Sequence, residues 1–165
     1  MVLACADVAY EGDRGLAACL LFAHWQAREP LRIVRASVCP VAAYESGAFY
    51  KRELPCLLAV LARVDIPVDC LVIDGYVWLG DGSEPGLGAR LFEALGGRTA
   101  IIGVAKTIRI DDRCSIPVRR GTSERPLYVT SAGIPQTEAA GTIAAMAGES
   151  RIPTLLQLAD RACRF

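Results

Sequence analysis

The chain has 165 residues, of which 53% are hydrophobic and 22% charged, and its formal net charge is zero. This length suits one domain, residues 1–165, with a sizeable core, and the lack of any uninterrupted apolar run of about 18 residues argues against a membrane span. Proteins that grip long stretches of nucleic acid are usually basic, so zero net charge confines any such role to a local patch.

The seven cysteines are scattered through apolar segments without a CxxC pair, and the only histidine is His24. This pattern argues against a zinc site and favours reduced, buried thiols. The first ten residues are apolar, but they contain Asp7 and have no basic lead, which argues against a signal peptide. We therefore expect a cytoplasmic protein.

Three apolar runs joined by short polar turns open the chain, at residues 2–9, 16–25 and 31–38. They predict three strands in an antiparallel meander. Asp7 interrupts the first run. Because an acid inside a core strand must be paired, hydrogen-bonded or metal-bound, this residue is the first candidate for a functional role.

Leucines at helical spacing follow an aromatic loop and predict the first helix: Leu54, Leu57, Leu58 and Leu61. Pro55 is tolerable there if it lies in the first turn. Glu53 comes just before the apolar face, at the expected helix start. The helix dipole alone would favour a carboxylate at this place by about 0.3 to 1 kcal/mol, so a purely structural role for Glu53 stays open.

Residues 70–106 predict a strand, a helix and a second strand. The run 70–73 ends in Asp74, and the run 100–105 ends in Lys106, as buried parallel strands end at a sheet edge. In open α/β sheets this edge is where ligands bind. The Gly-rich stretch between them matches neither GxGxxG nor GxxxxGK[ST], so it indicates a tightly packed helix entry rather than a phosphate loop.

The last third of the chain predicts a basic hairpin, a strand and two helices. The hairpin covers residues 108–120 and carries Arg109, Arg113, Arg119 and Arg120. The strand covers residues 126–133. The first helix covers residues 136–148, with Thr137 as a possible cap, and the second covers residues 153–165. The order of elements predicts an α/β fold, in which a mixed sheet combines an antiparallel three-strand meander with parallel strands and carries helices on both faces.

Three carboxylates fall at comparable places: Asp7, Glu53 and Asp74. If the first and central strands are neighbours, two of these acids face each other and repel unless a proton or a cation lies between them. Oxygen ligands without nearby histidine or cysteine suit Mg²⁺ or Mn²⁺, and Lys106 could neutralise a scissile phosphate. Taken singly, each acid could equally be solvated or ion-paired.

Aromatic side chains gather in the loop before the first helix, at Tyr44, Phe49 and Tyr50. They could stack on bases or belong partly to the core. The arginines of residues 109–120 and Arg52 could contact a nucleic-acid backbone, or form an ordinary solvated face.

With these residues in hand, the chain resembles the endonuclease V family of ribonuclease H-like nucleases. The resemblance covers nearly the whole chain. It rests on Asp7, Arg52-Glu53, Ile73-Asp74-Gly75, Ile102-Gly103-Val104-Ala105-Lys106, Pro126-Leu127-Tyr128-Val129, and Arg151-Ile152-Pro153 ahead of Ala159-Asp160. It implies Mg²⁺-dependent cleavage of a phosphodiester to the 3′ side of inosine in DNA or RNA. It also implies that the metal-binding acids are Asp7, Glu53 and Asp74, and that the catalytic lysine is Lys106.

The chain departs from the family pattern at three places. Ala43-Tyr44-Glu45-Ser46 stands where the family has a Pro-Tyr-Ile-Pro wedge, and the Gly-rich stretch replaces a His-Pro-Arg loop. Ile134 takes the place of a family histidine, for which Glu138 is a conceivable substitute. The catalytic acids are therefore better preserved than the parts that recognise the substrate.

Two hypotheses follow. In the first, the chain is a Mg²⁺- or Mn²⁺-dependent endonuclease that acts near inosine or another distorted base, in DNA repair or RNA processing. Its nucleic-acid contacts would then come from Tyr44, Arg52, Arg109 and Arg113. In the alternative, the same scaffold is a nucleic-acid-binding or protein-interaction module without turnover.

Overall fold

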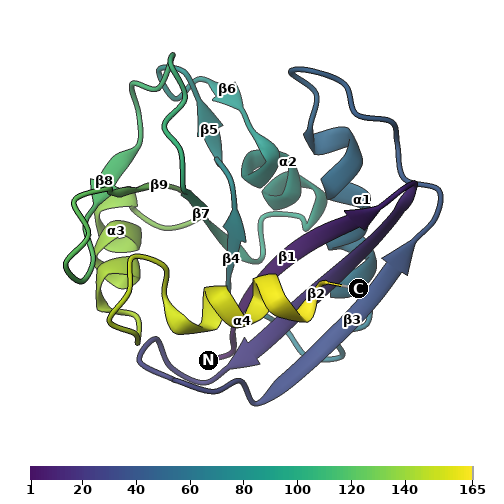
Figure 1. Ribbon diagram of the computed structural model, residues 1–165, viewed down its shortest axis with the longest axis horizontal. Helices are drawn as coiled ribbons and strands as arrows, with labels where there is room; N and C mark the ends of the chain where they lie inside the picture. The colour runs from purple at the N-terminus through teal and green to yellow at the C-terminus, as the bar shows by residue number, and fades with distance from the viewer. Residues whose placement is uncertain (165) are drawn as a thin grey trace.

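A computed structural model describes residues 1–164. Its main sheet has seven strands in the order β3-β2-β1-β4-β7-β9-β8, and a separate two-stranded sheet pairs β5 with β6 (Figure 1). The strands are β1 (Leu3–Glu11), β2 (Arg14–Phe22), β3 (Arg32–Val38), β4 (Cys70–Asp74), β5 (Trp78–Leu79), β6 (Glu84–Pro85), β7 (Ala100–Ala105), β8 (Ile116–Val118) and β9 (Leu127–Ala132). The helices are α1 (Tyr50–Leu61), α2 (Leu87–Ala94), α3 (Gln136–Ala145) and α4 (Thr154–Ala162).

The predicted meander is confirmed. β1 pairs antiparallel with β2 along its whole length, from Leu3 opposite Phe22 to Glu11 opposite Arg14, and β2 pairs antiparallel with β3. The second strand ends at Phe22, because a turn closed by a hydrogen bond from Ala27 N–H to the His24 carbonyl (3.0 Å) follows it.

The central strands run parallel, which gathers their carboxyl ends at one edge of the sheet. β4 lies between β1 and β7 and is parallel to both, with Ala6 opposite Ile73 and Asp74 opposite Val104. Asp7, Asp74 and Lys106 therefore follow one another across this edge. The placement agrees with the strand-helix-strand unit expected from the sequence.

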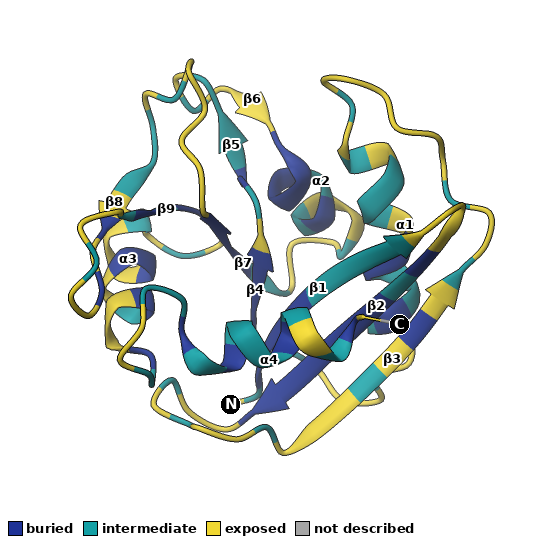
Figure 2. Cartoon of the chain, viewed as in Figure 1, coloured by how far each residue is buried: buried dark blue, intermediate teal, exposed yellow. Residues whose placement is uncertain are grey.

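Helices cover both faces of the sheet, as predicted, and the strands between them are buried (Figure 2). α1 and α2 pack on one face around Leu57, Leu71 and Leu91, and α3 and α4 pack on the other. Alternation along β1 and β4 sends residues 3, 5, 70 and 72 toward α3 and α4. The same alternation turns Asp7, in the middle of β1, and Asp74, at the end of β4, toward that face.

The predicted hairpin of residues 108–120 is wrong. Only Ile116–Val118 is extended, and it pairs with β9 instead of with the preceding segment. The segment 107–115 forms a loop, because the Asp112 carboxylate accepts hydrogen bonds from the backbone N–H groups of Cys114 and Ser115, both at 3.0 Å. These bonds satisfy backbone donors that a strand would have used.

Two details at helix starts also differ from expectation. α1 begins at Tyr50, so Pro55 lies inside the helix and not in its first turn. α3 begins at Gln136 after Pro135, which places Thr137 within the helix instead of at its cap. The closing helix ends at Ala162, and Phe165 of the expected range lies outside the described residues. No helix within residues 1–164 has the length and apolar character needed to cross a membrane.

Gly103 allows the turn after Asp74 to pack directly against β7. The turn is made by Gly75, whose φ of +125° favours glycine. A Cβ on Gly103 would lie 2.5 Å from the Gly75 carbonyl oxygen and 2.9 Å from the Val77 nitrogen. Both neighbours are backbone atoms, so neither can move without shifting the strand end that carries Asp74.

We therefore expect Gly103→Ala to destabilise the fold by about 1 to 3 kcal/mol, the usual range for overpacking. Urea denaturation of the purified protein measures this change. Gly141→Ala on α3 is the matched control, because the added Cβ would meet open space. This substitution should stabilise the helix by roughly 0.5 to 1 kcal/mol. Equal stability of Gly103→Ala and the native protein would contradict the close packing described here.

Candidate functional site

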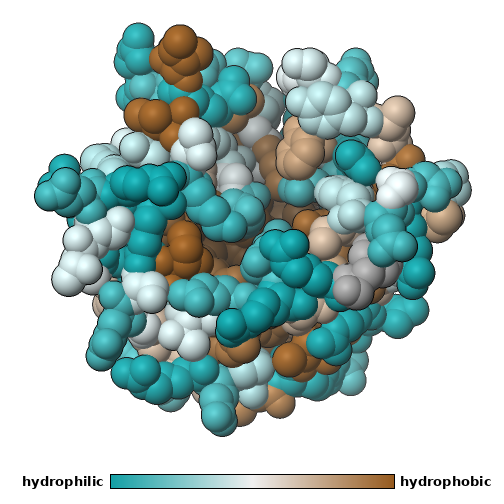
Figure 3. All heavy atoms as spheres, in the orientation of Figure 1, coloured by the Kyte–Doolittle hydropathy of each residue, from teal (hydrophilic) through white to brown (hydrophobic). Residues whose placement is uncertain are grey.

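A cavity of about 580 Å³ opens beside the carboxyl end of β4 and the middle of β1. Its lining comes from both ends of the chain and combines five carboxylates with aromatic side chains and two arginines: Asp7, Glu53, Asp74, Glu84, Asp160, Tyr44, Phe49, Tyr50, Tyr76, Arg90 and Arg109. The molecular surface is hollowed here, between the loop before α1 and the loops beside β5 and β6 (Figure 3).

Asp74 and Lys106 form an ion pair at the sheet edge. The Lys106 Nζ lies 3.3 Å from Oδ2 of Asp74, and both side chains are accessible to solvent. The parallel register of β4 and β7 produces this contact, because each residue is the last of its strand or follows it directly. Lys106 also lines a small hollow with Asp7 and Asp74, so an amine and two carboxylates share one place.

Asp7 is half-buried beside this pair. Its Oδ1 accepts a hydrogen bond from the Val8 backbone N–H at 2.9 Å. Burial, and next the negative charge of Asp74, raise the pKa of Asp7 to about 6, although the Val8 bond and the Lys106 charge oppose the shift. The acid that interrupts the first strand is therefore held at the edge of the core, facing a second acid.

Glu53 reaches the same cavity from the first turn of α1. Burial raises the pKa of Glu53 to about 8, and the charges of Asp7 and Asp74 add to this effect. The structure thus brings the three predicted acids together around one cavity, close enough for the charges of Asp7 and Asp74 to act on Glu53. A role of Glu53 at the helix start and a role in the cavity are compatible, since the first turn lies at the cavity wall.

Two further carboxylates line the cavity, and sequence reasoning selected neither of them as a site residue: Glu84 on β6 and Asp160. Asp160 comes from α4 and pairs with Arg164, just beyond the end of that helix, at 2.9 and 3.0 Å. Its charge also contributes to the raised pKa of Asp7. The signal for it was the Ala159-Asp160 pair, in which a buried alanine precedes the acid. Glu138, the conceivable histidine substitute, lies exposed on α3.

Aromatic side chains form the other half of the cavity. Tyr44 and Phe49 contact each other edge to face, with ring centroids 6.3 Å apart. The Arg90 guanidinium lies over the Tyr50 ring at 3.7 Å from its centroid. Arg90 was missed in the sequence, where it reads as an ordinary charged residue on the exposed side of a helix.

The arginines expected to contact nucleic acid have different surroundings. Arg109 lines the cavity and pairs with Asp111 at 3.0 Å. Arg113 is exposed on the loop 107–115. Arg52 instead covers the Tyr10 ring, 4.0 Å from its centroid.

Arg120 was expected to contact a nucleic-acid backbone or to lie on a solvated face, and the structure shows neither. It is buried, and its guanidinium donates hydrogen bonds to the carbonyls of Met146 (2.6 Å), Gly148 (3.1 Å) and Ser150 (2.8 Å). It therefore holds the segment between α3 and α4 in place and offers nothing to a backbone phosphate. Arg119, its neighbour, is exposed.

The chemistry of the cavity fits a hard divalent cation. Five carboxylates line it, and none of the described residues in its wall is a histidine or cysteine, which suits Mg²⁺ or Mn²⁺. Among residues 1–164, no three His, Cys, Asp or Glu side chains are arranged so that they could hold an ion as they stand. Binding a cation would therefore require the carboxylates to turn toward a common point.

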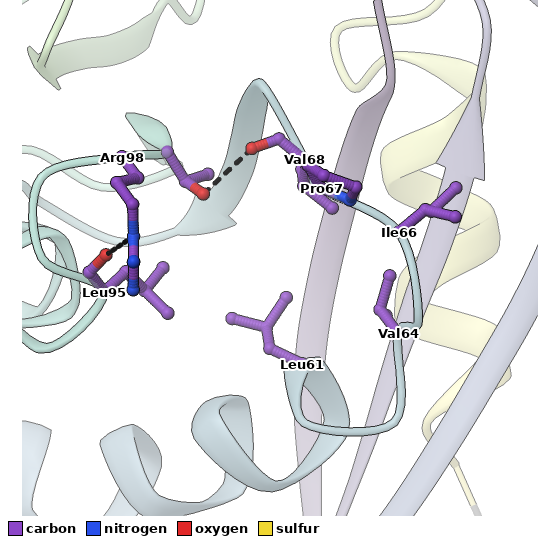
Figure 4. A pocket seen from close by; sticks show the side chains of 8 residues that line it. Leu61, Val64, Ile66, Pro67, Val68, Leu95 and Arg98 are labelled. Carbon is purple, nitrogen blue, oxygen red and sulfur yellow. Dashed lines mark hydrogen bonds between the residues drawn. The ribbon is translucent and has the colours of Figure 1, made fainter.

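A second cavity, of about 450 Å³, lies at the opposite edge of the sheet (Figure 4). Its wall is mainly apolar and includes Leu61, Ile66 and Leu95. Arg98 stands beside Leu95 and donates from Nε to its carbonyl at 3.4 Å. This cavity shares no lining residue with the carboxylate cavity.

Neither a family model nor a curated protein sequence matches the chain. Solved structures do match it. Endonuclease V from Streptomyces avermitilis is 23% identical with a TM-score of 0.83, over 99% of this chain and 80% of that one. Endonuclease V from Bacillus subtilis is 20% identical with a TM-score of 0.81, over 98% and 78% of the two chains.

Endonuclease V from Ciona intestinalis, solved in complex with a 24mer DNA containing an inosine followed by a ribo-adenosine, is 16% identical. Its TM-score is 0.79, over 99% of this chain and 84% of that one. Similarity at these identities establishes the fold. The chain therefore has the ribonuclease H-like mixed sheet predicted from its sequence, in the form found in endonuclease V structures.

The raised pKa values of the cavity acids predict how stability depends on pH. Between its ordinary pKa of 4.5 and about 8, Glu53 keeps in the folded protein a proton that the unfolded chain has lost; Asp7 does so from 3.8 to about 6. The folded state binds more protons in this window, so the free energy of unfolding falls as pH rises through it. In chelator-treated protein, Glu53→Gln should become more stable relative to the native chain as pH is raised from 5 to about 8.

Thermal melting at stepped pH values measures this difference. Glu93→Gln, which removes an exposed carboxylate from α2 outside the cavity, controls for the loss of one charge. A constant difference in melting temperature between Glu53→Gln and the native chain across this pH range would show that Glu53 is not perturbed by its neighbours.

Proposed function

We propose that this chain is a divalent-metal-dependent endonuclease that hydrolyses a phosphodiester bond near inosine or another distorted base in DNA or RNA. The observation that carries the proposal is the gathering of five carboxylates at one cavity whose other wall is aromatic, with Lys106 paired to one of them, Asp74, in an adjoining hollow. The shared fold with endonuclease V structures supports it, and the Ciona intestinalis protein is bound to inosine-containing DNA.

The carboxylates would hold the cation. Asp7 and Asp74 lie on neighbouring strands, Glu53 and Asp160 come from helices on opposite faces, and together they offer only oxygen ligands. A bound Mg²⁺ or Mn²⁺ supplies charge that activates water and stabilises the leaving oxygen of an in-line displacement. It would also relieve the repulsion that adds to the effect of burial in raising the pKa values of Asp7 and Glu53.

Lys106 would act on the phosphate. Its ammonium group lies 3.3 Å from Asp74 and is open to solvent, so a phosphate that approaches a cation held by the acids would also meet this positive charge. Neutralising charge as it develops on the scissile phosphate is the main way such groups lower a barrier. The Asp74 contact fixes the direction of the lysine side chain before substrate binds.

The aromatic half of the cavity would take the displaced base. A volume of about 580 Å³ is ample for one nucleobase, since ligand pockets are usually about 300 to 1,000 Å³. Tyr44 and Phe49 present ring faces and edges on which a base can stack. Arg109, which lines the cavity, and Arg113 on the same loop would contact backbone phosphates.

Cleavage assays test the proposal directly. With Mg²⁺ or Mn²⁺, the native chain should cut labelled inosine oligonucleotides, and Asp74→Asn should lose this activity to background. Lys106→Ala should lose roughly 100- to 1,000-fold in kcat, the usual effect of removing one charge-stabilising group. Glu93→Gln, outside the cavity, is the matched carboxylate control.

If the native chain and Asp74→Asn are equally inert on DNA and RNA carrying inosine, uracil, mismatches or flaps, the endonuclease proposal fails. A chain that still binds these nucleic acids would then be a binding module on the same scaffold.

Metal binding has its own readout. A cation that binds only the folded chain raises the melting temperature by mass action. We expect Mn²⁺ to raise it for the native chain at pH 8, to raise it less at pH 5, where protons compete for Asp7 and Glu53, and to raise it little for Asp74→Asn. Equal shifts for native chain and variant would place the bound ion elsewhere.

A further inference from the structure

Exposed hydrophobic side chains are concentrated beside the carboxylate cavity. Eight large hydrophobic side chains among residues 1–164 are exposed, and four of them belong to the two loops that flank the cavity: Tyr44, Phe49, Ile108 and Ile110. Tyr44 and Phe49 line it, whereas Ile108 and Ile110 stand on either side of Arg109, which lines it from the loop 107–115. Figure 3 shows hydrophobic side chains at the raised tip beside β5 and β6.

Ile110 is the most exposed of the four. Its side chain is 98% exposed and that of Ile108 is 54% exposed. Single exposed apolar residues need no explanation, but two isoleucines flanking a cavity-lining arginine form a narrow apolar tip next to the carboxylates. This tip has no use in the chemistry proposed for the cavity.

Hydrogen bonds hold the tip in its raised position. The Asp112 carboxylate accepts from the Tyr76 hydroxyl at 3.1 Å, in addition to the backbone N–H groups within the loop. The same Tyr76 hydroxyl accepts from the Arg109 N–H at 3.1 Å. Arg113 N–H donates to the Gly80 carbonyl at 2.8 Å, which braces the loop on the turn between β5 and β6. The isoleucines are thus presented by a built loop.

The size of the tip favours bases over a protein partner. Protein interfaces bury about 800 Å² on each side, far more than two isoleucines on a narrow loop supply. Apolar side chains of this kind do insert between base steps, where they unstack the bases and kink a duplex. Tyr44 and Phe49, on the other flanking loop, offer surfaces for the bases so displaced.

We propose that the loop 107–115 is a wedge that inserts Ile110, supported by Ile108, between bases of a duplex beside the carboxylate cavity. Insertion unstacks the neighbouring base so that it can enter the aromatic half of the cavity, while Arg109 holds the adjoining phosphate. The inference rests on the proposed endonuclease function for the identity of the duplex. To that function it adds the residues that unstack the bases of the duplex.

The test separates opening from cleavage. A duplex with 2-aminopurine next to inosine reports unstacking as a rise in fluorescence, measured with Asp74→Asn protein so that the strand stays intact. This protein should raise the fluorescence, and adding Ile108→Ser and Ile110→Ser should abolish most of the rise. In chains that keep Asp74, Ile108→Ser with Ile110→Ser should slow cleavage of duplex by about tenfold, which is the effect of losing one stacking contact. Cleavage of single-stranded substrate should stay unchanged.

Ile33→Ser is the matched control, since Ile33 is also exposed (40%) but lies on the edge strand β3. A protein with Ile108→Ser and Ile110→Leu should regain the unstacking that the Ile108→Ser/Ile110→Ser protein has lost. The melting temperature of the Ile108→Ser/Ile110→Ser protein should equal that of the parent protein, because the side chains of Ile108 and Ile110 lie outside the core.

The wedge is refuted if the serine variant unstacks duplex as Asp74→Asn alone does, or if it loses single-stranded and duplex cleavage equally. Failure of the endonuclease proposal looks different. The native chain would then cleave nothing, while the fluorescence assay would still support or refute the wedge.

Discussion

Mutual repulsion among carboxylates is the constraint on which the rest of the site depends. The parallel register of β1, β4 and β7 forces Asp7 and Asp74 to the same edge and the same face. α1 then adds Glu53 and α4 adds Asp160. With Glu84 of β6, five acids lie around one cavity, and such a fold must compensate their charge by retained protons, by Lys106 or by a bound cation.

The close packing of backbone near this edge serves the same arrangement. The turn after Asp74 packs against Gly103, and the guanidinium of Arg120 fixes the segment that leads into α4. Neither residue touches the cavity. Both determine where strand and helix ends lie, so the positions of the acids are set by backbone contacts more than by contacts among the acids themselves.

Much of this arrangement follows from the sequence, because buried parallel strands and amphipathic helices have strong periodicity. The runs before Asp74 and Lys106 predicted both strands and the edge they share. The loop 107–115 was not predictable in the same way, since its shape depends on Asp112 reaching Tyr76, a contact distant in sequence. Arg120 and Arg90 show the same limit: an arginine in a sequence does not reveal whether it will be buried, stacked or solvated.

Asp160 was not predicted as a site residue for a related reason, because its place in the cavity depends on how α4 packs across β1.

The packing of α4 on β1 has a consequence for folding. Asp7 and Asp160 come from nearly opposite ends of the chain, and contacts of such long sequence separation form late in folding. A polypeptide emerging from the ribosome would carry the first strand long before the last carboxylate arrives. The cavity is therefore completed only once residues 154–162 have formed α4 and packed against β1.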